Sequence, residues 1–312
     1  MARLIPASPR TTDILDDALD LIEDHFRGRP VPRAQSGEEL SHLLGEALNR
    51  SASPPAAEPV RIVRQFACTG GTLVCRALAA QPNVTLLSEV DPFNIDHLAR
   101  RKPGFAPTDL IRLADSRVRP LDNALKQAMF LAALKALYDA SSRTGRRLIL
   151  REHSHGRFCK GEDWSARPSV ADVVAGEFPA RTAVTVRHPM DSWLSLNANE
   201  WRHFEPFTLD EYATRYLAFL DDCRSAPVFK YEAFVEAPDE TLTDICRRLE
   251  LPMNESWQAL LRVITLTGDS GRRGSVIGVR ERRRPDEETL EAARKSEAFQ
   301  ALCARLDYAS DA

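Results

Sequence analysis

A strand–turn–helix segment, RQFACTGGTLVCRAL (64–78), contains two adjacent glycines between two threonines. Gly70 and Gly71 let successive backbone N–H groups converge, and the start of the following helix adds partial positive charge there. The hydroxyls of Thr69 and Thr72 are two further donors. The pattern predicts a cradle for a phosphate group. The segment lacks the lysine of a G-x-x-x-x-G-K-[ST] loop. The alternative to a phosphate cradle is a glycine-rich turn that binds no ligand.

A second segment, TAVTVRHPMDSWLSL (182–196), places an arginine where a buried strand ends. Pro189 then opens a helix, and Ser195 follows Arg187 by eight residues. A guanidinium and a hydroxyl on either side of a strand–helix junction are able to hold one phosphate between them. The segment indicates a second anion site. The alternative is an arginine that pairs with a neighbouring carboxylate, beside exposed serines.

A third segment, GDSGRRGSVIGVRERRR (268–284), joins a loop rich in glycine and serine to six arginines. In a chain with a net charge of -3 it is the densest positive stretch. A loop that carries Arg272, Arg273 and Gly274 could close over an anionic nucleotide. The alternative is a solvated basic turn, which is the usual structure of such a run.

The elements that must position these residues alternate between strands and helices. Strands are expected at 60–66, 84–88, 146–152, 182–187 and 226–232. Helices are expected at 72–80, 122–142, 169–176, 191–200, 208–223 and 238–249, the fifth opened by a capping box of Thr208 and Glu211. This order predicts an α/β fold with a central, mainly parallel sheet covered by helices on both faces. In such folds ligands bind at the carboxyl ends of the strands.

The residues before this domain form a helical N-terminal extension. Two amphipathic helices are expected at 12–26 and 37–49, followed by a linker rich in proline and alanine at 51–59. We therefore divide the chain into an extension and linker at 1–58 and an α/β domain at 59–312. The apolar faces of the two helices must pack on the main domain or on another subunit, so a homodimer is one possibility.

Composition limits the classes of protein that the chain can represent. Its 312 residues are 43% hydrophobic and 28% charged, as in an ordinary soluble globular protein. The net charge of -3 argues against a binder of nucleic acid or of anionic membranes. The sequence shows no apolar run of membrane-spanning length and no signal-peptide core, so we expect a cytoplasmic protein. The six cysteines are scattered and lack zinc-ligand spacing, so no metal site is expected.

The three segments together resemble the sulfotransferases that use 3′-phosphoadenosine-5′-phosphosulfate (PAPS), which have a fold related to that of P-loop proteins. The resemblance extends from about Val60 to Arg284. The 5′-phosphosulfate loop of the family is usually a Lys or Arg followed by S-G-T-T. The corresponding residues here are Cys68, Thr69, Gly70, Gly71, Thr72 and Leu73. The 3′-phosphate motif of the family matches Arg187, Pro189 and Ser195.

Two further parts of the resemblance concern the nucleotide. The family tends to carry a strand that ends in Tyr-Glu before a helix opened by proline, which corresponds to 229–252 with Tyr231. The resemblance implies that Tyr231 and the loop residues Arg272, Arg273 and Gly274 also contact PAPS, and that the product is 3′,5′-adenosine bisphosphate. It implies in-line transfer of the sulfuryl group to a hydroxyl (or amine) of a small-molecule or glycan acceptor.

Such a transfer needs a group that takes the proton of the acceptor. Glu89 ends the strand after the loop helix, 21 residues beyond Cys68, which resembles the spacing of the catalytic glutamate in tyrosylprotein sulfotransferases. His153 ends another strand and resembles the histidine of the Lys-Thr-His motif in cytosolic sulfotransferases. We favour Glu89 over His153. His155, on the same strand face as His153 by alternation, is a third candidate, and Glu89 could instead simply pair with an arginine.

Position 68 departs from the family, because the usual cation of the loop is replaced by the neutral thiol of Cys68. Its task would pass to Arg64, Arg76, Arg151 or backbone N–H groups. Two other functions remain open: a small-molecule kinase that uses ATP, and a catalytically impaired nucleotide-binding or scaffold protein of the same fold. Residues 94–121 and 197–206 are candidates for the acceptor pocket.

Overall fold

The fold is given by a computed structural model that describes residues 57–93, 108–115, 119, 121–160, 163–266, 277–279 and 281–310. These residues belong to the second of two compact units, Ala57–Ala312. The helices expected at 12–26 and 37–49 lie outside the described residues. So do Arg272, Arg273 and Gly274, and these expectations stay predictions.

Five parallel strands form the sheet in the described part of the chain, in the order β2-β3-β1-β4-β5. Their bounds are β1 (Val60–Gln65), β2 (Val84–Val90), β3 (Arg147–Glu152), β4 (Ala180–Val186) and β5 (Val228–Lys230). The central strand β1 is buried along most of its length, and Val60, Ile62 and Val63 are at most 1% exposed. A strand covered on both faces is buried in this way. The predicted parallel α/β architecture is confirmed.

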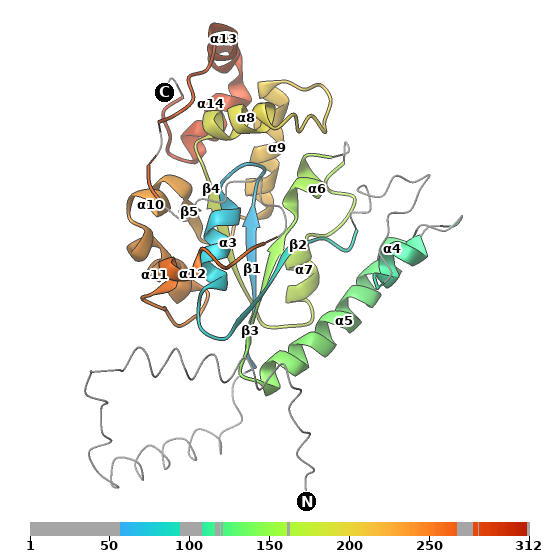
Figure 1. The fold of residues 1–312 in the computed structure, drawn as a ribbon. Helices are drawn as coiled ribbons and strands as arrows, with labels where there is room; N and C mark the ends of the chain where they lie inside the picture. Colours follow the sequence, from blue (N-terminus) through green and yellow to red (C-terminus); the bar gives the residue numbers. More distant parts are fainter. Residues whose placement is uncertain are drawn as a thin grey trace, which may run out of the picture. The chain divides into compact units, whose positions relative to one another are not determined.

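Helices cover both faces of the sheet and connect its strands (Figure 1). Their bounds are α3 (Gly71–Ala79), α4 (Leu110–Asp115), α5 (Asn123–Arg143), α6 (Ser154–Phe158), α7 (Val170–Ala175), α8 (Pro189–Ala198), α9 (Leu209–Asp222), α10 (Tyr231–Glu236), α11 (Pro238–Arg248), α12 (Trp257–Leu260), α13 (Glu287–Lys295) and α14 (Glu297–Arg305).

Alternation along β1 assigns its side chains to two apolar layers. Val63 packs with α3 and α11 on one face, in a cluster that also contains Ile149 of β3. Ile62 packs with α5 and α7 on the other face. Gln65 therefore shares the α3 face with Val63, whereas Arg64 shares the opposite face with Ile62.

A third apolar cluster surrounds the end of β1 and the helices α8, α9 and α14. Phe66, the residue after β1, stacks on Tyr216 of α9 with ring centroids 4.4 Å apart. Its ring also meets Tyr212 edge-on at 5.5 Å. Large buried aromatic side chains of this kind hold the strand end firmly. The turn that follows Phe66 therefore leaves the sheet from a fixed point.

Two local expectations are wrong. The strand expected at 226–232 is limited to β5, because Tyr231 begins α10, with Lys230 as its N-cap residue. As an edge strand, β5 pairs only with β4 among the described strands. The capping box at the start of α9 is also incomplete. Thr208 accepts a hydrogen bond from the backbone N–H of Glu211, but the carboxylate of Glu211 binds Arg215 at 2.7 Å instead.

Candidate active site

The glycine turn after β1 has no space for side chains. Gly70 has φ 80°, in the left-handed region, and a Cβ there would lie 2.2 Å from the ring of Tyr231. A Cβ at Gly71 would lie 1.2 Å from Oε1 of Gln65. Gly70 is the N-cap residue of α3 and has no side chain with which to cap it. The start of α3 is therefore kept clear of side chains at both glycines, and the phosphate cradle expected there stays a prediction.

The hydroxyl groups of the two threonines in the turn have different hydrogen-bond partners. Thr69 is 1% exposed, and its hydroxyl donates to the carbonyl oxygen of Phe66 at 2.8 Å. The hydroxyl hydrogen of Thr69 is thus used inside the loop, which leaves its backbone N–H as the candidate phosphate donor. The hydroxyl of Thr72 accepts a hydrogen bond from Nη2 of Arg151 at 2.8 Å. Leu73 continues the helix through its N–H, which donates to the carbonyl of Gly70 at 3.0 Å.

Arg151 lies beneath the turn and is only 3% exposed. The β1–β3 register pairs it with Val63, on the face that α3 covers. Its Nη1 donates to Ser88 Oγ at 3.0 Å and lies 2.8 Å from Oε1 of Glu89. With the amide of Gln65 oriented to present its oxygen, that oxygen accepts from Nε at 2.8 Å. Arg151 therefore brings positive charge directly to the loop that carries Cys68.

Glu89 and His153, the two predicted proton acceptors, are in contact. The pairing of β2 with β3 shifts register between Leu87 and Val90, and Glu89 has φ 61° within this irregularity. Such a bulge turns a side chain away from its regular direction. One carboxylate oxygen of Glu89 pairs with Arg151, and the other meets Nδ1 of His153. The structure thus joins loop, arginine, carboxylate and imidazole into one group.

His155 lies elsewhere than expected. Because β3 ends at Glu152, His155 belongs to α6 and does not share a strand face with His153. Its Nε2 lies 2.7 Å from Nδ1 of His203, and its ring meets Trp201 edge-on at 5.7 Å. The centroids of the His153 and His155 rings are 6.0 Å apart. Trp201 and His203, which the sequence placed in a candidate acceptor segment, therefore lie close to the proposed proton acceptors.

Of the three arginines considered as substitutes for a loop cation, two point elsewhere. Arg76 donates to backbone carbonyls at Leu261 and at Ile264, the latter at 3.1 Å. Arg64 lies on the opposite face of the sheet and pairs with Glu152 and Asp222, both at 2.6 Å. Arg151, which contacts Thr72, is the one of the three that reaches the loop.

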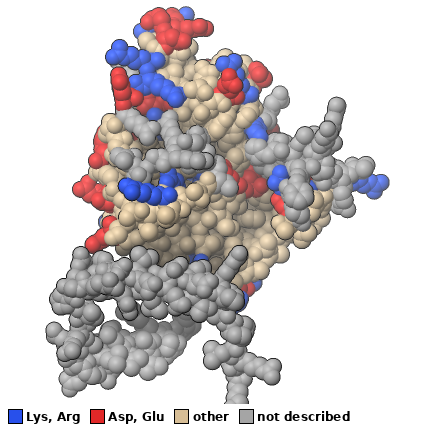
Figure 2. All heavy atoms as spheres, viewed as in Figure 1, with Lys and Arg blue, Asp and Glu red and all other residues tan. Residues whose placement is uncertain are grey.

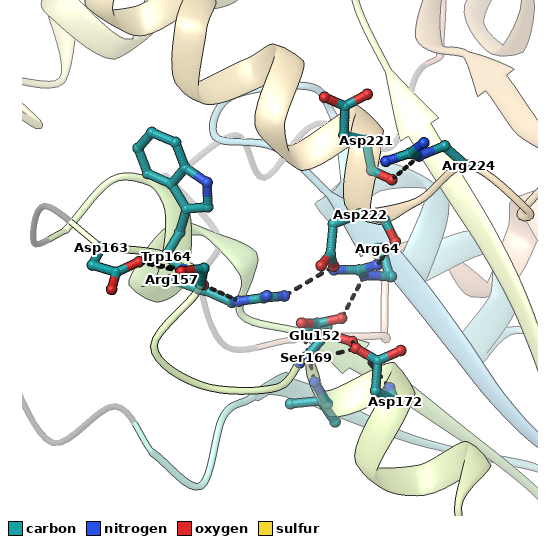
Figure 3. Close-up of polar contacts among 12 residues, drawn as sticks. Arg64, Glu152, Arg157, Asp163, Trp164, Ser169, Asp172, Asp221, Asp222 and Arg224 are labelled. Atoms are coloured by element: carbon teal, nitrogen blue, oxygen red, sulfur yellow. Dashed lines mark hydrogen bonds and ion pairs between the residues drawn. The ribbon is translucent and has the colours of Figure 1, made fainter.

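The Arg64 cluster nevertheless fixes the strand ends that flank the site (Figure 3). Asp222 at the end of α9 also binds Arg157 of α6, at 2.9 Å. Burial raises the pKa of Glu152 despite the nearby charge of Arg64. Burial alone would also raise the pKa of Asp222, but Arg64 and Arg157 outweigh it and the pKa is lowered. Glu152 directly precedes His153, so this cluster anchors the strand that presents the imidazole.

Arg187 follows β4 at the same edge of the sheet. Its guanidinium carbon lies 5.2 Å from the centroid of the Tyr231 ring, the ring that also crowds Gly70. Its Nη2 is 3.7 Å from a carboxylate oxygen of Asp191, and its buried Nε has no hydrogen-bond partner among the described residues. Ser195 lies further along α8 and is 8% exposed. Tyr231 thus lies against both the glycine turn and Arg187. The Nε–H group of Arg187 could donate a hydrogen bond to an anion.

The surface of the described residues carries charged side chains of both signs (Figure 2). On the face drawn in Figure 2, basic and acidic side chains are interspersed over the described residues. At the carboxyl edge of the sheet, positive charge comes from Arg151, which is buried, and from Arg187, which is mostly buried.

A sequence model of the Sulfotransferase family matches residues 66–255, more than half of the 312-residue chain. The match includes the glycine turn, Glu89, His153, Arg187 and Tyr231. The chain belongs to the sulfotransferase family. No curated protein matches its sequence.

Solved sulfotransferase structures are also similar to this sulfotransferase. A sulfotransferase domain from the curacin biosynthetic pathway is 15% identical, with a TM-score of 0.46, over 81% of this chain and 99% of that one. A sulfotransferase domain from the Synechococcus PCC 7002 olefin synthase is 19% identical, with a TM-score of 0.45, over 82% and 98%. Mouse sulfotransferase SULT7A1, complexed with PAP, is 12% identical, with a TM-score of 0.38, over 84% and 93%.

Sequence reasoning missed several residues around the site of this sulfotransferase. Asp191 follows Arg187 by four residues at the start of a helix, a spacing that was sufficient to suggest their contact. Glu232 accepts from the backbone N–H of His188 at 2.9 Å, and no local pattern indicates that contact. Arg282 belongs to the recognised basic segment, but its pairing with Asp191 at 3.0 Å depends on tertiary structure.

Two other features are absent from the described residues. No group of three or more His, Cys, Asp or Glu side chains there is arranged to hold a metal ion. None of the helices in the same residues combines the length and apolar character needed to cross a bilayer.

Proposed function

We propose that this sulfotransferase moves the sulfuryl group of PAPS to a hydroxyl (or amine) group of a small-molecule or glycan acceptor. The observation that carries the proposal is the contact of Tyr231 with both Gly70 and Arg187. One residue of each predicted phosphate site thus lies against the same aromatic ring, which supports the proposal. A nucleotide with phosphates at its 5′ and 3′ positions fits such a pair of sites.

The residues of the site fit PAPS at two points. The crowding at Gly70 and Gly71 is typical of a turn whose N–H groups must converge closely, and the first N–H groups of α3 follow it. We assign the 5′-phosphosulfate to Cys68, Thr69, Gly70, Gly71, Thr72 and Leu73. The unsatisfied Nε of Arg187 supports assignment of the 3′-phosphate to Arg187 and Ser195. Tyr231 lies against one residue of each site, and Arg272, Arg273 and Gly274 remain proposed parts of a covering loop.

PAPS, when bound, supplies an activated sulfuryl group, which passes in line to the acceptor oxygen as its bond to the 5′-phosphate breaks and adenosine bisphosphate is released. Glu89 accepts the proton of the acceptor, and His153 holds the carboxylate through Nδ1. Arg151 supplies the charge that Cys68 lacks, and through Thr72 it is tied to the turn. The residues thus mainly position reactants and neutralise charge, as in phosphoryl transfer.

Two other functions predict different results. A small-molecule kinase would be stabilised by ATP more than by PAPS. A catalytically impaired nucleotide-binding protein would bind adenosine bisphosphate without transferring the sulfuryl group. The contacts of Arg151 with Thr72 and Glu89 favour an active enzyme, because they place a cation and a carboxylate together beside the loop.

The test combines binding and transfer. We expect [³⁵S]PAPS to label a member of an acceptor panel, and Glu89→Gln to abolish labelling while calorimetric binding of 3′,5′-adenosine bisphosphate is nearly unchanged. His153→Ala should behave in the same way. Arg187→Ala should instead weaken binding by removing a charge-assisted contact. Stronger stabilisation by ATP than by PAPS, or unchanged bisphosphate binding by Arg187→Ala, would contradict the proposal.

A further inference from the structure

The C-terminal segment reaches the proposed nucleotide site from beyond the part of the chain that the family model matches. The match ends at residue 255. Arg282, 27 positions later, donates from Nε to Oδ1 of Asp191 at 3.0 Å and lies 3.2 Å from Oδ2. Asp191 is 6% exposed in the first turn of α8. An arginine from outside the matched region is therefore held at the helix that follows Arg187.

Arg282 and Arg187 share the carboxylate of Asp191. Nη2 of Arg187 lies 3.7 Å from Oδ2, the oxygen that Arg282 also approaches. The contact of Arg187 is longer than a hydrogen bond. Asp191 therefore engages Arg282 more closely than Arg187, so Arg282 keeps the carboxylate from neutralising Arg187 completely.

The carboxylate of Asp191 is shared by two guanidinium groups. Glu232, a second carboxylate in this region, accepts from the backbone N–H of His188 at 2.9 Å and from the hydroxyl of Tyr308. The side chain of Arg282 is 43% exposed, whereas that of Arg187 is 19% exposed. The charge of Arg282 also acts on the neighbouring residue, since burial and, after it, Arg282 lower the pKa of His188. Without Arg282, Asp191 would be left to neutralise Arg187.

We propose that Arg282 is a positioning residue for the 3′-phosphate: by pairing with Asp191 it preserves the positive charge of Arg187 for that phosphate. This inference rests on the proposed function, which assigns the 3′-phosphate to Arg187. It makes the C-terminal segment part of the nucleotide site. It also predicts that Arg282 selects for nucleotides that carry a 3′-phosphate over those that carry only a 5′-phosphate.

The experiment compares the binding of adenosine 3′,5′-bisphosphate and adenosine 5′-monophosphate by calorimetry. For Arg282→Ala we expect the Kd of the bisphosphate to rise about tenfold, equivalent to about 1.4 kcal/mol. The Kd of the monophosphate should change by less than about twofold, and the tenfold effect should shrink in high salt because Arg282 is partly exposed. Arg282→Lys, which keeps the charge, should recover most of the affinity.

Arg283→Ala is the matched control. Arg283 is the adjacent arginine and donates to the carbonyl of Leu194 at 3.2 Å, on the same helix but away from Asp191. It should leave both Kd values unchanged. Arg282→Gln serves as a second neutral variant if the alanine variant does not fold.

The possible results separate the two proposals. A wild-type protein that does not prefer the bisphosphate would overturn the 3′-phosphate assignment, and this inference with it. A wild-type preference that persists in Arg282→Ala and Arg282→Gln would overturn this inference alone. Equal weakening of both nucleotides, accompanied by a lower melting temperature of the ligand-free variant, would show that Arg282 has only a structural role and would also overturn it.

Discussion

Gly70 provides a sharp test of how the glycine turn is built, because two separate costs apply to any side chain there. An alanine at φ 80° would occupy the left-handed region, which costs an L-residue about 1–2 kcal/mol. The Cβ would also lie 2.2 Å from the Tyr231 ring. Overpacking of this kind costs about 1–3 kcal/mol. We expect Gly70→Ala to lower the free energy of unfolding by about 2–4 kcal/mol, after a small gain from the less flexible unfolded chain.

Gly145 offers a matched control for the backbone cost. It has φ 66°, and a Cβ there would meet nothing within 4 Å. Gly145→Ala should therefore cost only about 1 kcal/mol. The difference between the two variants measures the clash with Tyr231.

Urea unfolding followed by tryptophan fluorescence gives both free energies, and the double variant Gly70→Ala/Tyr231→Ala completes a thermodynamic cycle. Removal of the ring should relieve the clash, so the two substitutions should be non-additive by about 1–3 kcal/mol. In Gly70→Ala the displaced ring should also weaken binding of adenosine bisphosphate. If Gly70→Ala costs no more than Gly145→Ala, the close approach of Tyr231 to the turn is wrong, and with it the connection to Arg187.

Two further predictions concern stability. Because its folded pKa is lowered, Asp222 stabilises the protein above its unfolded pKa of about 3.9, and this stabilisation is lost as the pH falls through the folded value. Melting temperatures from about pH 6 to pH 3 should therefore fall less steeply for Asp222→Asn than for the wild type, and parallel curves would contradict the assignment. Ser296 accepts from the N–H of Phe299 at 3.0 Å and donates to Asp210 at 2.6 Å, so Ser296→Ala should cost about 1–2 kcal/mol in urea unfolding. Asp286→Ala, at the exposed cap of α13, is the control and should cost less.

The sequence was sufficient for features that depend on neighbouring residues. Alternating strands and helices predicted the parallel sheet. The doubled glycine predicted a turn into α3, because a left-handed residue before a helix is easiest for glycine. Spacing placed Arg187 at a strand end and Ser195 on the next helix. The limits of β5 could not be predicted, because an edge strand ends where its single neighbour no longer pairs with it.

Tertiary structure decided which of several similar residues reach the site. Arg64, Arg76 and Arg151 are residues of the same type, so the sequence could not distinguish them. The β1–β3 register places Arg151 on the face that α3 covers, and of the three only Arg151 contacts Thr72 of the loop. The bulge in β2 turns Glu89 toward His153, and a distant segment brings Arg282 to Asp191. Strand register, side-chain direction and long-range contacts depend on residues far apart in the chain. A local pattern of amino acids therefore cannot predict these three features.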